Sequence, residues 1–186
     1  MVHIMALWLP IVVSAVVVFV VSSLIHMALK YHNNDFGKLA NEDKVMDALR
    51  ALNIPPGEYI LPKAEGMKEM RSPEFKAKME KGPGVLMTIW PGSKPSMGMP
   101  LTQWFIYTLI IGVFAAYVAG RALPAGAPYL AVFRFAGFTA FACYAVANWQ
   151  ATIWWKQSWR RLITGTLDGL IYSLLTAGVF GWLWPR

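Results

Sequence analysis

Charge and cysteine are the two features that the sequence has little of. Only 15% of its 186 residues are charged and 56% are hydrophobic, whereas a water-soluble domain carries about 25% charged residues. This composition excludes an ordinary soluble domain and indicates a membrane protein. The single cysteine, Cys143, excludes an intrachain disulfide framework and a four-cysteine metal site.

Four stretches of the chain are long and apolar enough to cross a bilayer. A membrane-spanning helix needs about 20 mostly apolar residues, and we predict such helices at 4–29, 101–120, 129–149 and 162–183. Residues 1–8 contain no Lys or Arg, so the first span is expected to be retained rather than cleaved as a signal peptide. Tryptophans at the ends of the predicted spans agree with the aromatic belts of membrane proteins.

The segment 30–100 between the first two spans is polar. It holds 11 of the 17 Lys and Arg residues and 9 of the 10 Asp and Glu residues. Candidate N-caps at Asn41 and Ser72 predict two helices, and the runs 58–61 and 85–90 predict two short strands. The predicted fold is therefore an all-α membrane bundle of four transmembrane helices with a small α+β extramembrane insertion between helices 1 and 2. An insertion of this size buries only a thin core, so it is expected to lean on the membrane, on itself or on a partner.

The segment 150–161 between the last two spans is predicted to be a loop at the bilayer surface. Tryptophans alternate there with cations, and this mixture suits a layer of anionic lipid headgroups. The predicted interfacial anchors are Trp154, Trp155, Lys156, Trp159, Arg160 and Arg161.

Basic residues gather on one side of the predicted spans and set the expected orientation. Arg121 and Arg186 are the only Lys or Arg residues on the opposite side, apart from Arg134 within a span. By the positive-inside rule, both termini should face outward and residues 30–100 should be cytoplasmic, in an integral protein of the inner or cytoplasmic membrane. Because long loops translocate largely regardless of charge, the short loop 150–161 supports this orientation more strongly than the insertion does.

Small residues recur at every fourth position in two of the predicted spans. Helices in lipid associate closely where small side chains let their backbones approach. We predict that these ridges pack the four helices on one another, with docking to another subunit as the alternative. The predicted helix-packing residues are Gly165, Gly169, Ser173, Ala177 and Gly181 in the fourth span and Gly112, Ala116 and Gly120 in the second.

Asp168 and Arg134 are the only charged residues inside the predicted spans. In an antiparallel hairpin they would lie on the order of 15 Å apart along the membrane normal, so no ion pair is expected between them. Other polar residues are expected at about the same depth in the membrane as Asp168. This predicted intramembrane cluster comprises Ser22, Ser23, His26, Gln103, Tyr107, Asn148, Thr164 and Asp168. It is interpreted first as a hydrogen-bonded latch between helices, and second as a proton or ligand site in which His26 titrates beside the carboxylate.

No cofactor or metal site is predicted. Six methionines of the polar segment, among them Met97 and Met99, invite a Cu(I) site, but methionine is also an ordinary filler of small cores. A bis-histidine haem is not expected, because His3 and His26 lie at opposite ends of one span and His32 lies beyond it. A single bond from His26 to a pigment metal stays an open alternative. The acidic residues of 30–100 balance most of its basic charge, so nucleic acid is not an expected partner.

These features lead to two functional hypotheses. The ridges, the Trp-rich loop and the thin insertion predict a non-catalytic accessory or scaffold subunit of a larger membrane complex, such as an energy-converting one. Its partners would be the lipid bilayer and other membrane subunits or a second copy of the chain. The alternative is a small proton- or ion-coupled membrane transporter that uses Asp168 and His26. An enzyme is less expected, because the sequence shows no nucleophile–base spacing and no phosphate-binding loop.

Overall fold

The structure, a computed structural model, describes residues 1–92 and 96–186. Within this part of the chain, four helical segments are long and apolar enough to cross a membrane: 4–28, 98–122, 129–155 and 159–182. The four spans predicted from composition are therefore confirmed as helices. Helices suit such segments because a helix satisfies its own backbone hydrogen bonds where lipid offers none.

The described chain divides into two compact units. The bundle unit comprises Met1–Gly37 and Ser96–Arg186, and the insertion unit comprises Lys38–Pro95. Residues 30–37 thus belong to the bundle unit, although the sequence groups them with the polar insertion. Their hydrogen bonds to the last helix, described below, are the physical reason.

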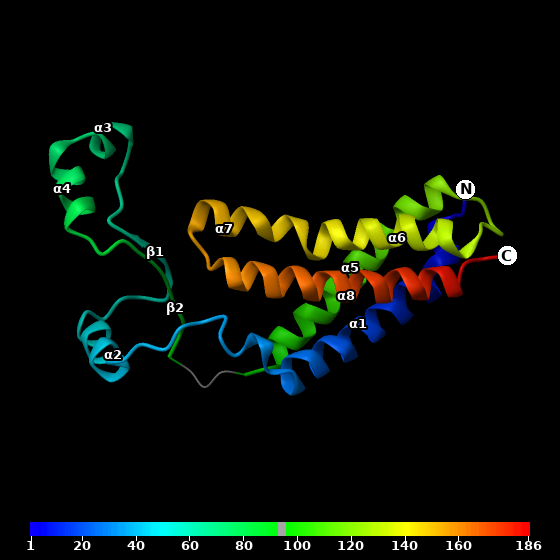
Figure 1. Ribbon diagram of the computed structural model, residues 1–186, viewed down its shortest axis with the longest axis horizontal. Coiled ribbons are helices and arrows are strands. Elements are labelled where there is room, and N and C mark those ends of the chain that lie inside the picture. The colour runs from blue at the N-terminus through cyan, green and yellow to red at the C-terminus, as the bar shows by residue number, and fades with distance from the viewer. Residues whose placement is uncertain (93–95) are drawn as a thin grey trace. The chain divides into compact units, whose positions relative to one another are not determined.

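The bundle unit is built from helices that Figure 1 labels along the chain. A short 3-10 turn, η1 (Ile4–Leu7), leads into α1 (Trp8–Ala28), and the turn η2 (Lys30–His32) follows. The second and fourth spans are α5 (Gly98–Ala122) and α8 (Trp159–Trp182). The third span is α6 (Tyr129–Tyr144), continued through η3 (Val146–Asn148) into α7 (Trp149–Trp155).

The expected surface loop 150–161 is mostly helical. Helix α7 extends to Trp155, and α8 begins at Trp159, which leaves only residues 156–158 as a link. The sequence of α7 contains no Gly or Pro that would stop a helix, and Lys156 then ends it in the left-handed conformation common after helix C-termini. The side chains of Trp154, Trp155 and Trp159 are exposed, as an interfacial anchor requires.

The insertion unit contains helices and strands, as the sequence predicts. Its elements are α2 (Glu42–Ala51), β1 (Gly57–Leu61), α3 (Met67–Met70), α4 (Pro73–Lys81) and β2 (Val85–Ile89). The two strands pair antiparallel, with Gly57 opposite Ile89 and Leu61 opposite Val85. Ser72 caps α4 by accepting a hydrogen bond from the backbone N–H of Phe75 at 3.1 Å. Residues 93–95, at the end of this unit, lie outside the described residues.

Small residues bring α6 and α8 close together. A Cβ added at Gly169 would lie 2.8 Å from the Cβ of Ala145, and one added at Gly137 would lie 2.9 Å from the Cβ of Ala177. At the far end of the same ridge, Gly181 lies against the ring of Tyr129. Ser173 is also buried in this region. The ridge of α8 therefore packs inside the bundle.

Gly165 differs from the other small residues of α8. A Cβ at this position would meet no heavy atom within 4 Å. The reason is that Gly165 faces a cavity rather than a neighbouring helix. The shorter ridge of α5 does make contacts: Gly112 lies against Ile11, Gly120 lies against the backbone of Val2, and Ala116 is fully buried.

The two halves of the bundle differ in the kind of side chain that fills the interior. The half that contains both chain ends is filled by an apolar cluster that includes Leu7, Ala115, Val132 and Phe180, all fully buried. Figure 1 shows the N- and C-termini at this end. The other half contains the aromatic side chains of Tyr144 and Tyr172 and the polar groups described next.

Candidate functional site

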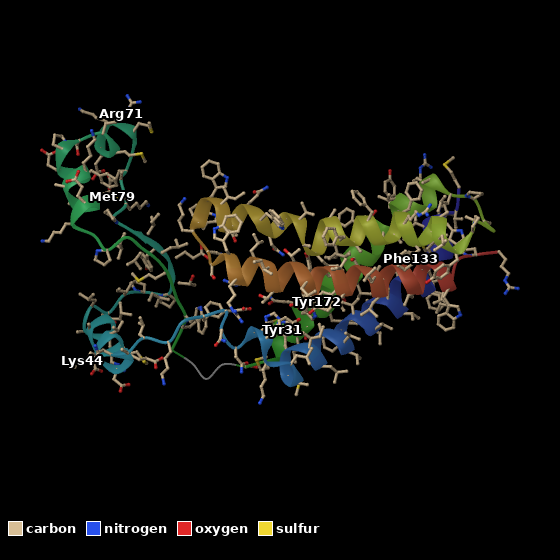
Figure 2. The ribbon with its side chains drawn as sticks, in the orientation of Figure 1. Tyr31, Lys44, Arg71, Met79, Phe133 and Tyr172 are labelled. Carbon is tan, nitrogen blue, oxygen red and sulfur yellow. The ribbon has the colours of Figure 1, made fainter. Side chains whose placement is uncertain are left out.

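Asp168 is the centre of a cluster of titratable side chains in the polar half of the bundle. Its side chain is only 8% exposed. The hydroxyl of Tyr31 donates a hydrogen bond to its Oδ1, and Figure 2 shows Tyr31 close to Tyr172 of α8. The Nε2 of His32 lies 3.0 Å from Oδ2, and the Nε2 of His26 lies 3.9 Å from the same oxygen.

A second carboxylate, Asp35, supports this cluster from the segment that follows η2. Its side chain is also 8% exposed. Its Oδ2 lies 2.7 Å from the Nδ1 of His32 and accepts a hydrogen bond from the hydroxyl of Thr164 at 2.9 Å. The Nε of Arg160 lies 3.9 Å from its Oδ1. Asp35 and Asp168 therefore flank His32 on opposite sides of its ring.

Burial and partners act in opposite directions on the pKa of Asp35. Burial raises the pKa of this carboxyl, but the hydrogen bonds from His32 and Thr164 and the charges of His32 and Arg160 outweigh it, and the net pKa is lowered. Burial, and then the hydrogen bond to Asp168, raise the pKa of Tyr31. Asp35 is thus an ionised acceptor, and Tyr31 is a neutral proton donor.

The local sequence explains why residues 31–35 reach α8. Helix α1 ends at Ala28, and Leu29 adopts an extended conformation that breaks the helical course. The turn η2 follows at once, and backbone hydrogen bonds from Asn33 to Lys30 and from Asp35 to His32 fold the chain tightly. This tight turn stacks the ring of His32 on that of His26, with 4.6 Å between the ring centroids.

A cavity of about 680 Å³ opens beside this cluster. Its walls come from α1, η2 and the segment after it, α5, the third span and α8, and they combine polar groups with aromatic rings. The lining residues include His26, His32, Asp35, Trp104, Thr164 and Asp168. The apolar cluster around Phe180 fills the opposite half of the bundle, so the cavity faces one end of the bundle only.

The structure brings most of the predicted polar residues to this cavity. The predicted cluster members that line it are Ser22, Ser23, His26, Asn148, Thr164 and Asp168. Two predicted members lie elsewhere. Tyr107 donates a hydrogen bond to the carbonyl of Cys143 at 3.2 Å, and Gln103 is exposed. Between helices, the indole of Trp104 donates a hydrogen bond to the hydroxyl of Ser22 at 2.8 Å.

Three residues of the site are absent from the sequence-based cluster: Tyr31, His32 and Asp35. The hydropathy boundary assigns them to the polar insertion, whereas the chain turns back at Leu29. One signal could have identified them, because a His and an Asp three residues apart directly follow the end of a span that carries His26.

The structure also shows Arg134 exposed on α6, with no ion pair among the described residues, as its depth in the membrane predicts.

The basic side chains beside the site contact groups other than Asp168. Within the described part of the chain, no Lys or Arg forms an ion pair with Asp168, whose charge is met only by a phenol and two histidines. Arg160 points to Asp35, and the guanidinium of Arg161 lies over the ring of Phe36 at 4.9 Å. This buried carboxylate thus has no permanently charged partner among the described residues. Comparisons of the chain with protein-family models, with curated proteins and with solved structures give no match.

Proposed function

We propose that this protein takes a small cation from one aqueous side into the cavity between its four helices, as the binding step of an ion transporter. The observation that carries the proposal is Asp168, a carboxylate that is buried in a candidate span and faces a 680 Å³ cavity. An Asp at the centre of a membrane helix costs about 2.5–3.5 kcal/mol on insertion scales. A bound cation offsets this cost, because a buried charge is stable only with a charged or well-bonded partner.

The packing of the bundle supports entry from one side. The cavity contains the polar cluster around Asp168 and opens near the ends of α1 and the third span, whereas the apolar cluster closes the opposite half. The small-residue ridge of α8 is used inside the bundle, at Gly169 and Gly181, and therefore gives no support to docking of another subunit.

Uptake into vesicles tests the proposal. Purified protein is reconstituted into proteoliposomes, and uptake of Na⁺, K⁺, Ca²⁺, Mn²⁺ and Zn²⁺ is followed with trapped indicators. We expect uptake of at least one cation above that of protein-free vesicles, and its loss in Asp168→Asn, which removes the charge but keeps the shape. Thr139→Val is the matched control, because Thr139 is a half-buried residue of α6 that does not line the cavity and whose side chain bonds only the carbonyl of Phe135. Folded wild-type protein that takes up none of these cations would overturn the proposal.

An accessory or scaffold subunit is the second candidate, and the insertion unit favours it. Among the described residues of this unit, Phe75 is the only buried hydrophobic side chain, and large apolar side chains such as Met46, Leu52 and Trp90 are exposed. A unit with so little core gains stability from a partner surface. Purification from the native membrane in mild detergent separates the two candidates. A scaffold brings other subunits with it in fixed ratio, whereas a transporter is purified alone or with copies of itself.

A further inference from the structure

Three side chains of the cavity wall converge at the spacing of metal ligands. His26, His32 and Asp168 each offer one ligand atom, and these atoms lie within 4.8 Å of one another. Bonds of about 2.0–2.2 Å from zinc to nitrogen or oxygen, set at tetrahedral angles, place ligand atoms about 3.3–3.6 Å apart. The measured separations of 3.0 and 3.9 Å from the Oδ2 of Asp168 to the two Nε2 atoms bracket this range.

The second nitrogen of each histidine ring has an acceptor of its own. The Nδ1 of His26 lies 2.9 Å from the carbonyl oxygen of Ser22, and the Nδ1 of His32 lies 2.7 Å from the Oδ2 of Asp35. A carbonyl oxygen only accepts hydrogen bonds, and the Oδ2 of Asp35 already accepts one from Thr164, so the Nδ1 of each ring is the donor in these contacts. The Nε2 atoms face Asp168 and are the ring atoms that stay available to a metal. A carbonyl or carboxylate that fixes the tautomer in this way is the usual outer partner of a metal-binding histidine.

The Nε2 of His32 has no hydrogen bond within the described part of the chain, although it is buried. Its 3.0 Å approach to Asp168 is close enough for an ion pair but does not have the geometry of a hydrogen bond. Buried polar atoms are rarely left unpaired, and such an atom requires an explanation. A metal ion bound by the Nε2 and the carboxylate together supplies both with a partner.

We propose that His26, His32 and Asp168 bind a divalent first-row transition metal, with Zn²⁺ as the best match. This inference rests on the proposed function, in that the cavity receives a cation, and it names the chemical class of that cation. Two imidazole nitrogens and one carboxylate oxygen suit Zn²⁺ or Co²⁺, whereas Mg²⁺ and Ca²⁺ prefer oxygen ligands alone. Three protein ligands leave a fourth position for water or another ligand. The side chain of His26 is 55% exposed, which gives an ion access to the site.

Metal binding at equilibrium tests the proposal without any need for transport. Full-length, untagged protein is purified in detergent, stripped with a chelator and titrated with Co²⁺, whose visible absorption reports the geometry of its ligands. We expect one Co²⁺ per chain, displaced by Zn²⁺ but not by an excess of Mg²⁺. His32→Gln and Asp168→Asn should each weaken binding by more than the roughly 10–100-fold that loss of an outer partner costs.

Two further variants separate a ligand role from a general effect on folding. Asp35→Asn should weaken Co²⁺ binding about 10–100-fold and leave the absorption of the saturated site unchanged, because it alters an outer partner of His32 and none of the three ligands. His3→Gln is the matched control, since His3 lies before η1 and bonds only the backbone of Met5. Absence of saturable Co²⁺ binding by folded wild-type protein, or equal losses in His3→Gln and His32→Gln, would overturn the metal site.

The two proposals can fail separately. Uptake of Na⁺ or K⁺ by vesicles, without Co²⁺ binding by the purified protein, overturns the transition-metal site and leaves cation transport standing. Stoichiometric Co²⁺ binding that depends on His32 and Asp168, without uptake of any cation, supports the metal site and overturns transport.

Discussion

The contact between Gly169 of α8 and Ala145 at the end of α6 offers a sharp test of the packing. The substitution Gly169→Ala adds one Cβ, which would lie 2.8 Å from the Cβ and 3.1 Å from the backbone N of Ala145. Carbon atoms prefer separations of about 3.5–4.0 Å, so the two helices must move apart. Overpacking of this kind costs about 1–3 kcal/mol, partly offset by the gain of about 0.8–1.0 kcal/mol when Ala replaces Gly in a helix.

Gly165→Ala is the matched control, one helical turn away on the same ridge. A Cβ there meets no heavy atom within 4 Å, so only the helix-propensity gain remains. The two variants should therefore differ by about 1–3 kcal/mol, with Gly169→Ala the less stable. At about 2–4 °C per kcal/mol for a chain of this size, the gap in Tm is roughly 2–12 °C. Thermal unfolding in detergent, followed by tryptophan fluorescence, measures it. Equal Tm values for the two variants would refute the close approach of α6 and α8.

Three other outcomes follow from the site and from the sequence. Tyr31→Phe removes the donor to Asp168 and should destabilise the metal-free protein by about 1–3 kcal/mol, measured by thermal unfolding, while an unchanged Tm would contradict the hydrogen bond. In double-mutant cycles of stability, measured by thermal unfolding, Asp168→Asn should couple more strongly to His32→Gln than to His26→Gln, because the first pair of side chains is 3.0 Å apart and the second 3.9 Å. The reverse order of coupling energies would contradict this geometry. If residues 30–100 are cytoplasmic, Glu65→Cys in a cysteine-free background should resist a membrane-impermeant thiol reagent in intact cells, and ready labelling would reverse the orientation.

The membrane spans could be predicted from the sequence because they depend on the summed hydropathy of many residues. A run of about 20 apolar residues excludes other structures whatever its neighbours are. The start of α4 was equally predictable, since Ser72 and Pro73 act locally on the helix N-terminus. The site was predictable only in part. Asp168, His26 and Thr164 share a depth in the membrane, which counting residues along the spans reveals.

The remaining parts of the site depend on the direction in which the chain leaves a helix. His32 and Asp35 reach α8 because Leu29 is extended and η2 turns tightly. The hydropathy of the sequence does not reveal such a turn. The ridge of α8 presents a similar limit. A period of four residues identifies the small residues, but it does not tell which of them meets a helix, as Gly169 does, and which meets a cavity, as Gly165 does.

The close contact of α6 and α8 has a mechanical consequence for any rearrangement of the bundle. Where the helices approach closely at Gly137 and Gly169, no layer of long side chains lies between them, and we expect the pair to move as one rigid body. Asp168 belongs to this rigid body, whereas His26 and His32 lie on the end of α1 and the turn after it. An ion held by all three side chains would thus add a further tie between the end of α1 and the rigid pair, beside the hydrogen bonds from Tyr31 to Asp168 and from Thr164 to Asp35.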